Sequence, residues 1–276
     1  MSADNELTPE TRPPDDRSHI ENVRKFFDRE SGRYVDQRYG TYDAAVSRPY
    51  LERQAIVLEF LSGLGGAALD LGCGPGVLLP SLLERCSSVA AVDVSPEMLE
   101  RARTAIAGRP GADRVSISLG SADAIPFGDR SFDVVTCIGV ISYWPNTEKG
   151  LAEVARVLRP GGTLILQASN IVAPHEIEDR LLKHPYQRIV TRLTGRDIRD
   201  TADLRLKAFY PPRLDARLEQ AGLIPVDRRF YDFQIPLLRY LSRDRAQRWA
   251  SSLMTLSRTP LLKLLGTGYL VRARRP

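Results

Sequence analysis

Two aspartates, Asp70 and Asp93, have the residue type and spacing to bind a ligand through its hydroxyl groups. Each follows a short apolar run, at residues 67–69 and 89–92, of the kind that forms a buried strand. Between them, glycines stand at alternate positions: Gly72, Gly74 and Gly76. Glycine lets a chain turn sharply and lets a ligand lie against bare backbone. An acid at the end of the second strand can accept hydrogen bonds from both hydroxyls of a ribose. The stretch therefore predicts a strand–turn–helix–strand unit that holds a nucleoside.

Two classes of ligand use such a unit. A dinucleotide fold requires G-x-G-x-x-G, in which the third glycine packs the helix on the strand and the pyrophosphate lies over the helix start. Here the turn reads G-C-G-P-G, directly after the acid-bearing strand. This spacing resembles motif I of the class I S-adenosylmethionine (SAM) methyltransferases, whose ligand has no phosphate. The resemblance implies SAM as the cofactor and S-adenosyl-L-homocysteine (SAH) as the product.

Other stretches resemble the same family: D-V-S-P-E-M-L at residues 93–99, G-S-A-D-A-I-P-F at 120–127 and L-R-P-G-G-T-L at 158–164. The resemblance implies that Met98 lies against the adenine face, where core packing is the alternative, and that Asp123 accepts the adenine amino proton. The cofactor-binding residues that it implies in the core are Asp70, Gly72, Cys73, Gly74, Gly76, Asp93, Val94, Met98, Ser121, Ala122, Asp123, Ala124 and Cys137. From the N-terminal lead-in, Tyr39 is expected as an aromatic lid and Arg53 as the partner of the SAM carboxylate; ordinary helix packing is the alternative for both.

The elements that must position these residues alternate between strand and helix. From Asp70 to Gln167 the chain offers five strand–helix steps in the order that a right-handed doubly wound sheet requires. We expect an α/β fold: a mostly parallel seven-stranded Rossmann-like sheet with an antiparallel edge strand and helical cap insertions. The expected divisions are a disordered tail at 1–19, an N-terminal helical lid at 20–61, a SAM-binding core at 62–170, a substrate cap at 171–210 and the C-terminal part of the core at 211–276, with a helical insertion at 236–267.

The composition and charge of the chain narrow the range of functions that it can have. The chain has 276 residues, 26% of them charged, and a formal net charge of +5. Its arginines mostly alternate with acids, which is typical of a solvated surface, and no nucleic-acid-binding module is recognisable, so we expect no nucleic-acid partner. Three cysteines without a C-x-x-C pair predict neither a zinc site nor a disulfide framework. With no apolar signal core and no apolar stretch of spanning length, we expect a cytoplasmic protein.

Methyl transfer from SAM is an in-line displacement, so the protein must above all hold the acceptor atom against the methyl group. A hydroxyl acceptor also needs a base for its proton. His175, shortly after the fifth predicted strand, is the first choice of base, and Tyr143 is the second; polar packing within the cap is the alternative for both. Family members that bind a metal carry an acid after the fourth strand. This chain has Cys137-Ile138-Gly139 there, so we expect no metal.

Three hypotheses on function follow. The first is metal-independent methylation of a small, partly apolar metabolite, at an oxygen atom. The second is methylation of a membrane-borne quinone or lipid, with peripheral membrane contact through residues 236–267, where arginines stand among leucines. The third is a non-catalytic SAM-binding partner protein, because the sequence does not firmly identify a catalytic base. The oligomeric state stays open, and a dimer is one of the alternatives.

Overall fold

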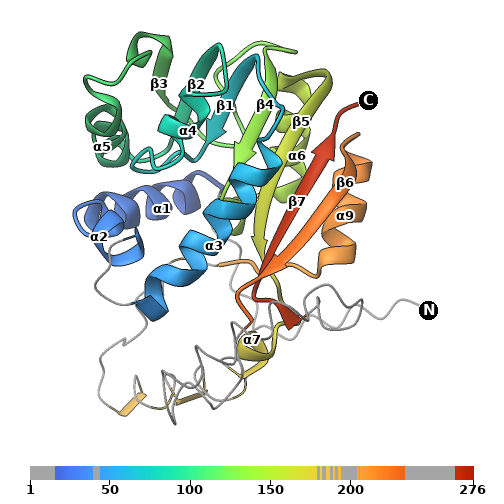
Figure 1. Cartoon of the computed structure of the whole chain (residues 1–276). Helices are drawn as coiled ribbons and strands as arrows, with labels where there is room; N and C mark the ends of the chain where they lie inside the picture. Colours follow the sequence, from blue (N-terminus) through green and yellow to red (C-terminus); the bar gives the residue numbers. More distant parts are fainter. Residues whose placement is uncertain are drawn as a thin grey trace.

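The computed structural model describes residues 16–39, 44–178, 204, 206–233 and 265–276, and the single positions 181, 185, 186, 189, 192 and 193. In this part of the chain, a sheet of seven strands forms the centre of the molecule (Figure 1). The strands are β1 (Ala67–Leu71), β2 (Ser88–Asp93), β3 (Val115–Leu119), β4 (Phe132–Cys137), β5 (Leu158–Ser169), β6 (Ile224–Tyr231) and β7 (Gly268–Arg274).

The strand order is β3-β2-β1-β4-β5-β7-β6. Strands β1 to β5 run parallel, whereas β7 lies antiparallel between β5 and β6. The chain moves outward from β1 to β3 and then returns to place β4 on the other side of β1. Ligands of open α/β sheets bind outside the carboxyl ends of the strands at such a reversal. The expected doubly wound sheet with an antiparallel edge is thereby confirmed.

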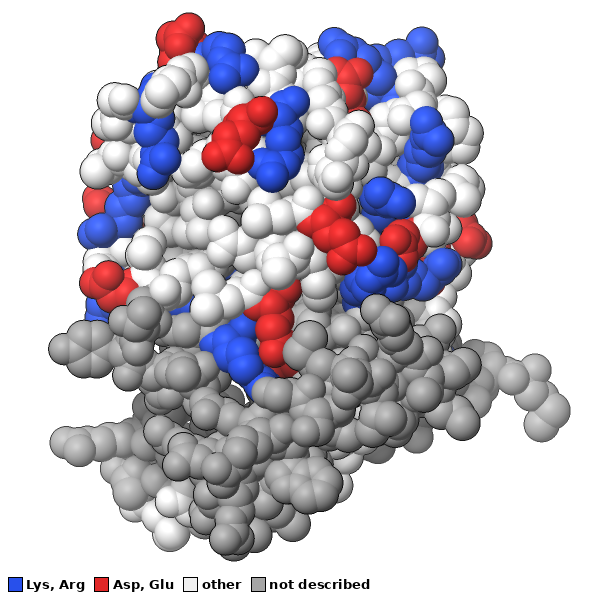
Figure 2. Space-filling view, in the orientation of Figure 1, with Lys and Arg blue, Asp and Glu red and all other residues white. Residues whose placement is uncertain are grey.

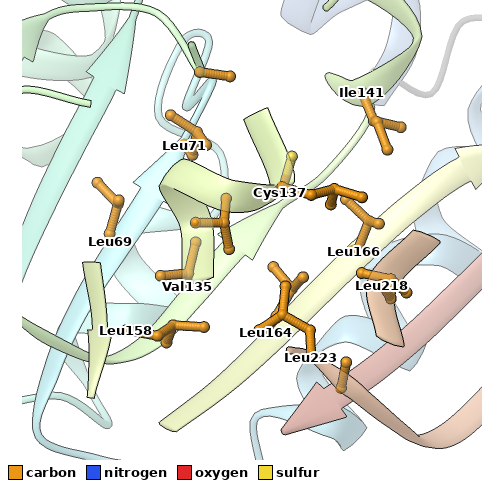
Figure 3. Close-up of a cluster of buried hydrophobic side chains, with 14 of the residues drawn as sticks. Leu69, Leu71, Val135, Cys137, Ile141, Leu158, Leu164, Leu166, Leu218 and Leu223 are labelled. Carbon is orange, nitrogen blue, oxygen red and sulfur yellow. The ribbon is translucent and has the colours of Figure 1, made fainter. Parts of the chain in front are cut away.

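Helices cover both faces of this sheet. They are α1 (Asp16–Glu30), α2 (Tyr34–Tyr39), α3 (Ala44–Phe60), α4 (Leu79–Leu83), α5 (Pro96–Ile106), α6 (Thr147–Val157), α7 (Pro174–Glu178) and α9 (Pro211–Gln220), with short 3₁₀ turns η1 (Ala112–Arg114) and η2 (Ile141–Tyr143). Helices α6 and α9 pack on one face with Leu69 and Leu71 (Figure 3). Helices α3, α4 and α5 pack on the other face with Ala68. Successive strand residues point to opposite faces, which is why one short strand supplies both cores.

The N-terminal helices α1 and α2 lie beside the end of the sheet at which β1 and β4 finish (Figure 1). Helix α1 begins at Asp16, so the last residues of the tail expected at 1–19 are helical, which corrects that boundary. His19 lies in this first turn and is 7% exposed, because its Nε2 is bonded to the Tyr143 carbonyl at 3.0 Å. Residues 1–15 lie outside the described part of the chain.

Strand β5 is longer than the sequence indicates. The motif L-R-P-G-G-T-L predicts a tight turn before a strand from Thr163 to Gln167, yet β5 begins at Leu158. Leu158 pairs with Phe132 of β4. At the other end of the chain, the Gly161 N–H donates to the Arg275 carbonyl at 2.8 Å, and the Arg275 N–H donates to the Gly162 carbonyl at 2.9 Å. These bonds extend the ladder between β5 and β7, and a local pattern cannot reveal them.

Much of the expected substrate cap and most of the insertion expected at 236–267 lie outside the described residues. None of the helices in the described part of the chain is both long and apolar enough to cross a bilayer. On the face that Figure 2 shows, Lys and Arg are interspersed with Asp and Glu. Many of the basic side chains form short-range ion pairs, such as Arg103 with Glu100 at 2.6 Å.

Candidate functional site

Two adjoining pockets open at the carboxyl ends of β1, β2 and β4. The first pocket is walled by these strand ends, by the loop after β3, by residues 138–145 and by α1, and it holds about 720 Å³ of empty space including the part open to solvent. The second pocket, about 520 Å³ on the same measure, lies between the glycine turn and α3. They share four wall residues: Tyr34, Gly72, Gly74 and Ile138. One elongated ligand could therefore occupy both.

The glycine turn is pinned to the end of β2. The N–H groups of Gly72 and Cys73 donate to the Val92 carbonyl at 2.7 and 3.0 Å. The next N–H, that of Gly74, donates to Asp93 Oδ2 at 2.9 Å. Gly74 has a φ of +52°, and a Cβ built on it would meet no atom within 4 Å. The turn thus leaves open space directly above bare backbone, as expected for a ligand cradle.

The two flanking glycines allow close packing, and Gly72 also lines both pockets. A Cβ on Gly72 would lie 2.4 Å from Val140 Cγ2, so that glycine lets Val140 approach the turn. A Cβ on Gly76 would lie 3.0 Å from the Ala102 Cα in α5. Gly76 lines neither pocket. Gly76 was expected to bind the cofactor. The structure gives it a packing role instead, because its missing side chain lets α5 approach the turn.

Asp93 forms part of the first pocket's wall, with each carboxylate oxygen held by backbone. Oδ2 accepts from Gly74, and Oδ1 accepts from the Ser95 N–H at 2.9 Å. Burial raises the pKa of Asp93, while these N–H groups act in the opposite direction. The carboxylate is fixed in place, and a second lone pair on each oxygen stays available to a ligand hydroxyl.

Asp70 lies in the wall of the second pocket and is 3% exposed. The Thr136 hydroxyl donates to its Oδ1 at 2.7 Å. Burial raises the pKa of Asp70 to about 7; the Thr136 hydrogen bond lowers it, and the negative charge of Asp93 raises it further. A cationic ligand beside Asp70 would favour its ionised form.

Arg53 and Tyr39 form the outer wall of the second pocket. Arg53 is 9% exposed, and its Nη2 donates to the Tyr39 hydroxyl at 2.8 Å. Its guanidinium also lies 4.9 Å from the ring centroid of Tyr50. Within the described residues no carboxylate forms an ion pair with Arg53. A buried guanidinium whose partners are neutral phenols is suited to bind an anionic group of a ligand.

The far end of the first pocket contains the residues expected around an adenine ring. Val94, Met98, Ser121, Ala122 and Asp123 all line it. The Ser121 hydroxyl donates to Asp123 Oδ1 at 2.5 Å, which fixes that carboxylate in the wall.

Two residues that were expected to bind the cofactor line neither pocket. Ala124 forms an isolated bridge with Ser121 and lines neither pocket, because its backbone closes the turn after β3. Cys137 is completely buried in the core beneath α6 and also lines neither pocket. Its neighbour Ile138 lines both pockets.

The two side chains expected to act as a base differ in placement. Tyr143 lines the first pocket, and burial raises the pKa of its phenol to about 12. At neutral pH the phenol therefore keeps its proton, and it suits donation of a hydrogen bond better than proton abstraction. His175 lies in α7, and none of the α7 side chains that the structure describes lines either pocket. The His175 side chain lies outside the described part of the structure.

Several wall residues come from the segment expected as an N-terminal helical lid, although the sequence did not single them out as site residues. Ile20, Val23 and Phe27 of α1 cover the first pocket, and the Phe27 ring meets that of Tyr143 edge-on at 5.1 Å. Their three- and four-residue spacing marks one face of a helix, but nothing local says what that face covers. Trp144, which the family resemblance places with Tyr143 at a substrate-facing position, also lines the first pocket, and its indole N–H is buried without a hydrogen-bond partner among the described residues.

Residues 69–166 match a family model described as a methyltransferase domain. A demethylmenaquinone methyltransferase from Deinococcus radiodurans is 35% identical over 166 residues, which cover 58% of this chain and 66% of that protein. Across this relative and five other curated proteins that it matches, the chain spans 37% to 66% of their lengths.

Solved structures show the same fold. A methyltransferase from Haloferax volcanii, in complex with the Trm112 activator, has a TM-score of 0.62 at 20% identity and covers 91% of this chain and 97% of its own. The cyclase SpnF has a TM-score of 0.61 at 18% identity, with 93% and 97% covered. The family match over residues 69–166 includes the glycine turn and both aspartates that frame it. This chain therefore contains a domain of the class I SAM-dependent methyltransferase family.

Proposed function

We propose that this chain binds SAM across the two adjoining pockets and transfers its methyl group to a small, partly apolar acceptor, at an oxygen atom. The observation that carries the proposal is the pairing of the pockets: a fixed carboxylate, Asp93, stands in one and a buried guanidinium without a carboxylate partner, Arg53, in the other. SAM presents ribose hydroxyls and an α-carboxylate at comparable places along its length.

The residues present fit the cofactor in detail. Asp93 would accept hydrogen bonds from the ribose hydroxyls, and Gly74 would let the ligand lie on the turn. Met98 and Asp123 would hold the adenine ring at the far end of the first pocket. Arg53 would bind the α-carboxylate in the second pocket. When bound, SAM supplies a methyl group that its sulfonium already activates.

The chain's own contribution to transfer is orientation and exclusion of water. Ile20, Val23 and Phe27 roof the first pocket with apolar side chains, which suits an acceptor with an apolar body. Holding two reactants at attack distance supplies about 7–11 kcal/mol in favourable cases. The Tyr143 phenol, which stays protonated at neutral pH, would orient an acceptor oxygen by donating a hydrogen bond.

A second acceptor class has some support. The relative from D. radiodurans is named for demethylmenaquinone, and an apolar roof also suits a quinone. A quinone would have to arrive from a membrane. The segment that we expect to dock there, residues 236–267, lies outside the described residues except for its last three.

Calorimetric titration of SAH tests the cofactor assignment. We expect micromolar binding by the full chain and a loss of about a hundredfold or more for Asp93→Ala. Asp93 also fixes the turn, so Arg53→Met, a change on α3 outside the turn, serves as the second variant. Unchanged binding in both variants, with native circular dichroism, would refute the assignment.

A screen for methyl transfer from labelled SAM tests the activity itself. Transfer to an acceptor oxygen is the expected result. Strong SAH binding without transfer to any acceptor in the screen would favour the non-catalytic partner protein. The likeness to a cyclase shows why this screen is needed, because the fold alone does not establish the reaction.

A further inference from the structure

We infer that Lys207 is a positioning residue for methyl transfer: its backbone and side chain together fix residues 142–145, which carry three wall side chains of the first pocket. The inference rests on the proposed function and adds to it the residue that holds this wall in place. Lys207 lies in the segment expected as the substrate cap, and none of the family motifs in the sequence includes it.

Four successive backbone carbonyls, those of residues 142–145, accept hydrogen bonds from other parts of the chain. The Lys207 N–H donates to the carbonyl of residue 142 at 3.0 Å, and its Nζ donates to the carbonyls of residues 144 and 145 at 2.7 and 2.8 Å. His19 Nε2 lies 3.0 Å from the remaining carbonyl, that of Tyr143. A carbonyl only accepts, so this nitrogen carries a proton. One lysine thus holds three of the four carbonyls, and α1 holds the other.

The Lys207 ammonium is committed to these carbonyls. An ammonium has three N–H donors, and two of them are used here. Lys25 and Lys149 pair with acids, each at 3.5 Å, whereas Lys207 forms no ion pair with any residue that the structure describes. Hydrogen bonds from a charged donor are shorter and stronger than those between neutral groups. The half-buried Lys207 side chain therefore fastens residues 144 and 145 rather than neutralising an acid.

Lys207 is itself anchored to the sheet. Phe209, two residues further on, is buried, and its N–H donates to the Ser169 carbonyl at the end of β5 at 2.8 Å. The Phe209 carbonyl accepts from the Ile171 N–H at 3.0 Å. The chain that leaves the sheet after β5 thus returns to the same strand end. Because β4 and β5 are neighbours, Lys207 ties the segment that follows β4 to the end of β5.

The fixed segment is the wall against which we expect the acceptor to lie. Its side chains Tyr143, Trp144 and Pro145 line the first pocket, whereas Lys207 lines neither pocket. The Trp144 ring packs on Gly150 of α6, where a Cβ would lie 2.4 Å from Cε3. A misplacement of about 1 Å can cost about a hundredfold in rate. Loss of the Lys207 ammonium should therefore slow transfer with little change in cofactor affinity.

Acrylamide quenching of Trp144 fluorescence measures how firmly this wall is held. The chain has two tryptophans, so Trp249→Phe leaves Trp144 as the only emitter. In this background, saturated with SAH, Lys207→Met should raise the Stern–Volmer quenching constant by at least about twofold, because residues 144 and 145 lose their anchor. Lys207→Arg, which can still donate to both carbonyls, should restore the low value. SAH affinity should stay within about twofold throughout.

Lys25→Met is the matched control, because Lys25 is exposed on α1 and pairs with Glu21. It should leave the quenching unchanged. With an acceptor found in the transfer screen, Lys207→Met should also lower kcat by at least about tenfold while the KM for SAM stays the same.

Quenching that does not rise in Lys207→Met, a rise that Lys25→Met shares, or a kcat that stays at the wild-type value would overturn the inference, while SAH binding upholds the proposed function. Failure of the wild-type chain to bind SAH would instead refute the proposed function. Should Lys207→Met not fold, His19→Leu removes the fourth hydrogen bond from a separate element, and the quenching of Trp144 in that variant decides.

Discussion

Two acids, Asp70 and Asp93, are buried at the carboxyl ends of neighbouring strands, and burial raises the pKa of each. An ion in such a place costs free energy unless a partner compensates it. Backbone N–H groups compensate Asp93, whereas Asp70 has the single Thr136 hydroxyl. The ligand-free site is therefore prepared for a positive charge, and the sulfonium and ammonium groups of SAM would supply it.

The weak compensation of the Asp70 carboxylate predicts how the stability of the chain depends on pH. Asp70 ionises at about pH 3.8 in the unfolded chain but keeps its proton to about pH 7 in the folded chain. Between these values the folded state binds more protons, so the free energy of unfolding falls as the pH rises. For a shift of this size the loss approaches about 4 kcal/mol. Asp70→Asn, whose amide oxygen can still accept from Thr136, should make the decline shallower and leave the share that the raised pKa of Asp93 contributes.

Urea unfolding of the ligand-free chain between about pH 5 and pH 8 measures this effect. The variant should become the more stable protein as the pH rises, yet bind SAH less tightly than wild type. Parallel stability curves for the two proteins would show that Asp70 ionises normally in the folded chain.

Gly74 allows a second prediction about a single residue. Its φ is positive and the space beyond its Cα is open, so Gly74→Ala should fold but place a methyl group in the ligand cradle. Gly63 has the same two properties and lies outside both pockets, so Gly63→Ala is the matched control. Both variants should lose about 1–2 kcal/mol of stability through backbone strain.

Only Gly74→Ala should weaken SAH binding, by about tenfold or more. Calorimetry on both variants, with thermal unfolding in parallel, gives the comparison. Equal SAH affinity in the two proteins would mean that the ligand does not lie on the turn.

At the scale of elements, α1 connects the pocket roof to the cofactor side. Asp28 on α1 accepts a hydrogen bond from the Ser95 hydroxyl at 2.6 Å, and the Ser95 N–H in turn donates to Asp93. The same hydroxyl caps α5 by accepting from the Met98 N–H at 3.1 Å. One short hydrogen-bonded chain thus joins the roof to the carboxylate that we expect to bind ribose.

Breaking this connection should speed ligand release. A hydrogen bond to a charged group contributes about 1.5–3 kcal/mol, so Asp28→Ala should raise the SAH dissociation rate by about tenfold. Glu21→Ala is the control, because Glu21 pairs with Arg24 on the same helix but does not reach Ser95. Stopped-flow dissociation measures both. Equal rates in the two variants would show that α1 does not retain the ligand.

The sequence predicts elements well where the signal is local. The turn from Gly72 to Gly76 and the strands on either side of it are readable because apolar runs, glycines and acids lie close together. The start of β5 is not, because Leu158 pairs with Phe132 of β4 and residues 161 and 162 bond to Arg275 near the end of the chain. Phe27 belongs to the segment expected as a lid, but the sequence does not show which of the lid residues line the pocket.

The site residues follow the same division. Asp93 and Asp123 were predicted because they belong to contiguous motifs, and the structure places both in the first pocket. Tyr34 was expected only as part of the helical lid and not as a site residue, because it reaches the pockets through the packing of α2 against the strand ends. The catalytic assignments, by contrast, depend on which side chains converge in space. The position of His175 in the sequence does not show which other side chains lie near it.

At the scale of the whole molecule, the proposed ligand touches elements that are far apart in sequence. The pocket walls come from α1, α2 and α3, from the glycine turn and from residues 138–145, whereas the β6–β7 edge contributes none. Binding of SAH should therefore couple the N-terminal helices to the sheet. Exposed helices of this kind open locally more easily than central strands, so a ligand that bridges them suppresses that opening.

Hydrogen exchange with and without saturating SAH tests this coupling. At short labelling times, exchange should slow together in residues 16–39, 72–76 and 138–145, and stay unchanged along β7, which central pairing already protects. At about a hundredfold excess over its dissociation constant, SAH should also raise the free energy of unfolding by about 2.7 kcal/mol. Protection limited to the glycine turn, with α1 and α2 exchanging as before, would mean that the helices are not part of the binding site. The roof over the first pocket and the Asp28 connection both require the joint response.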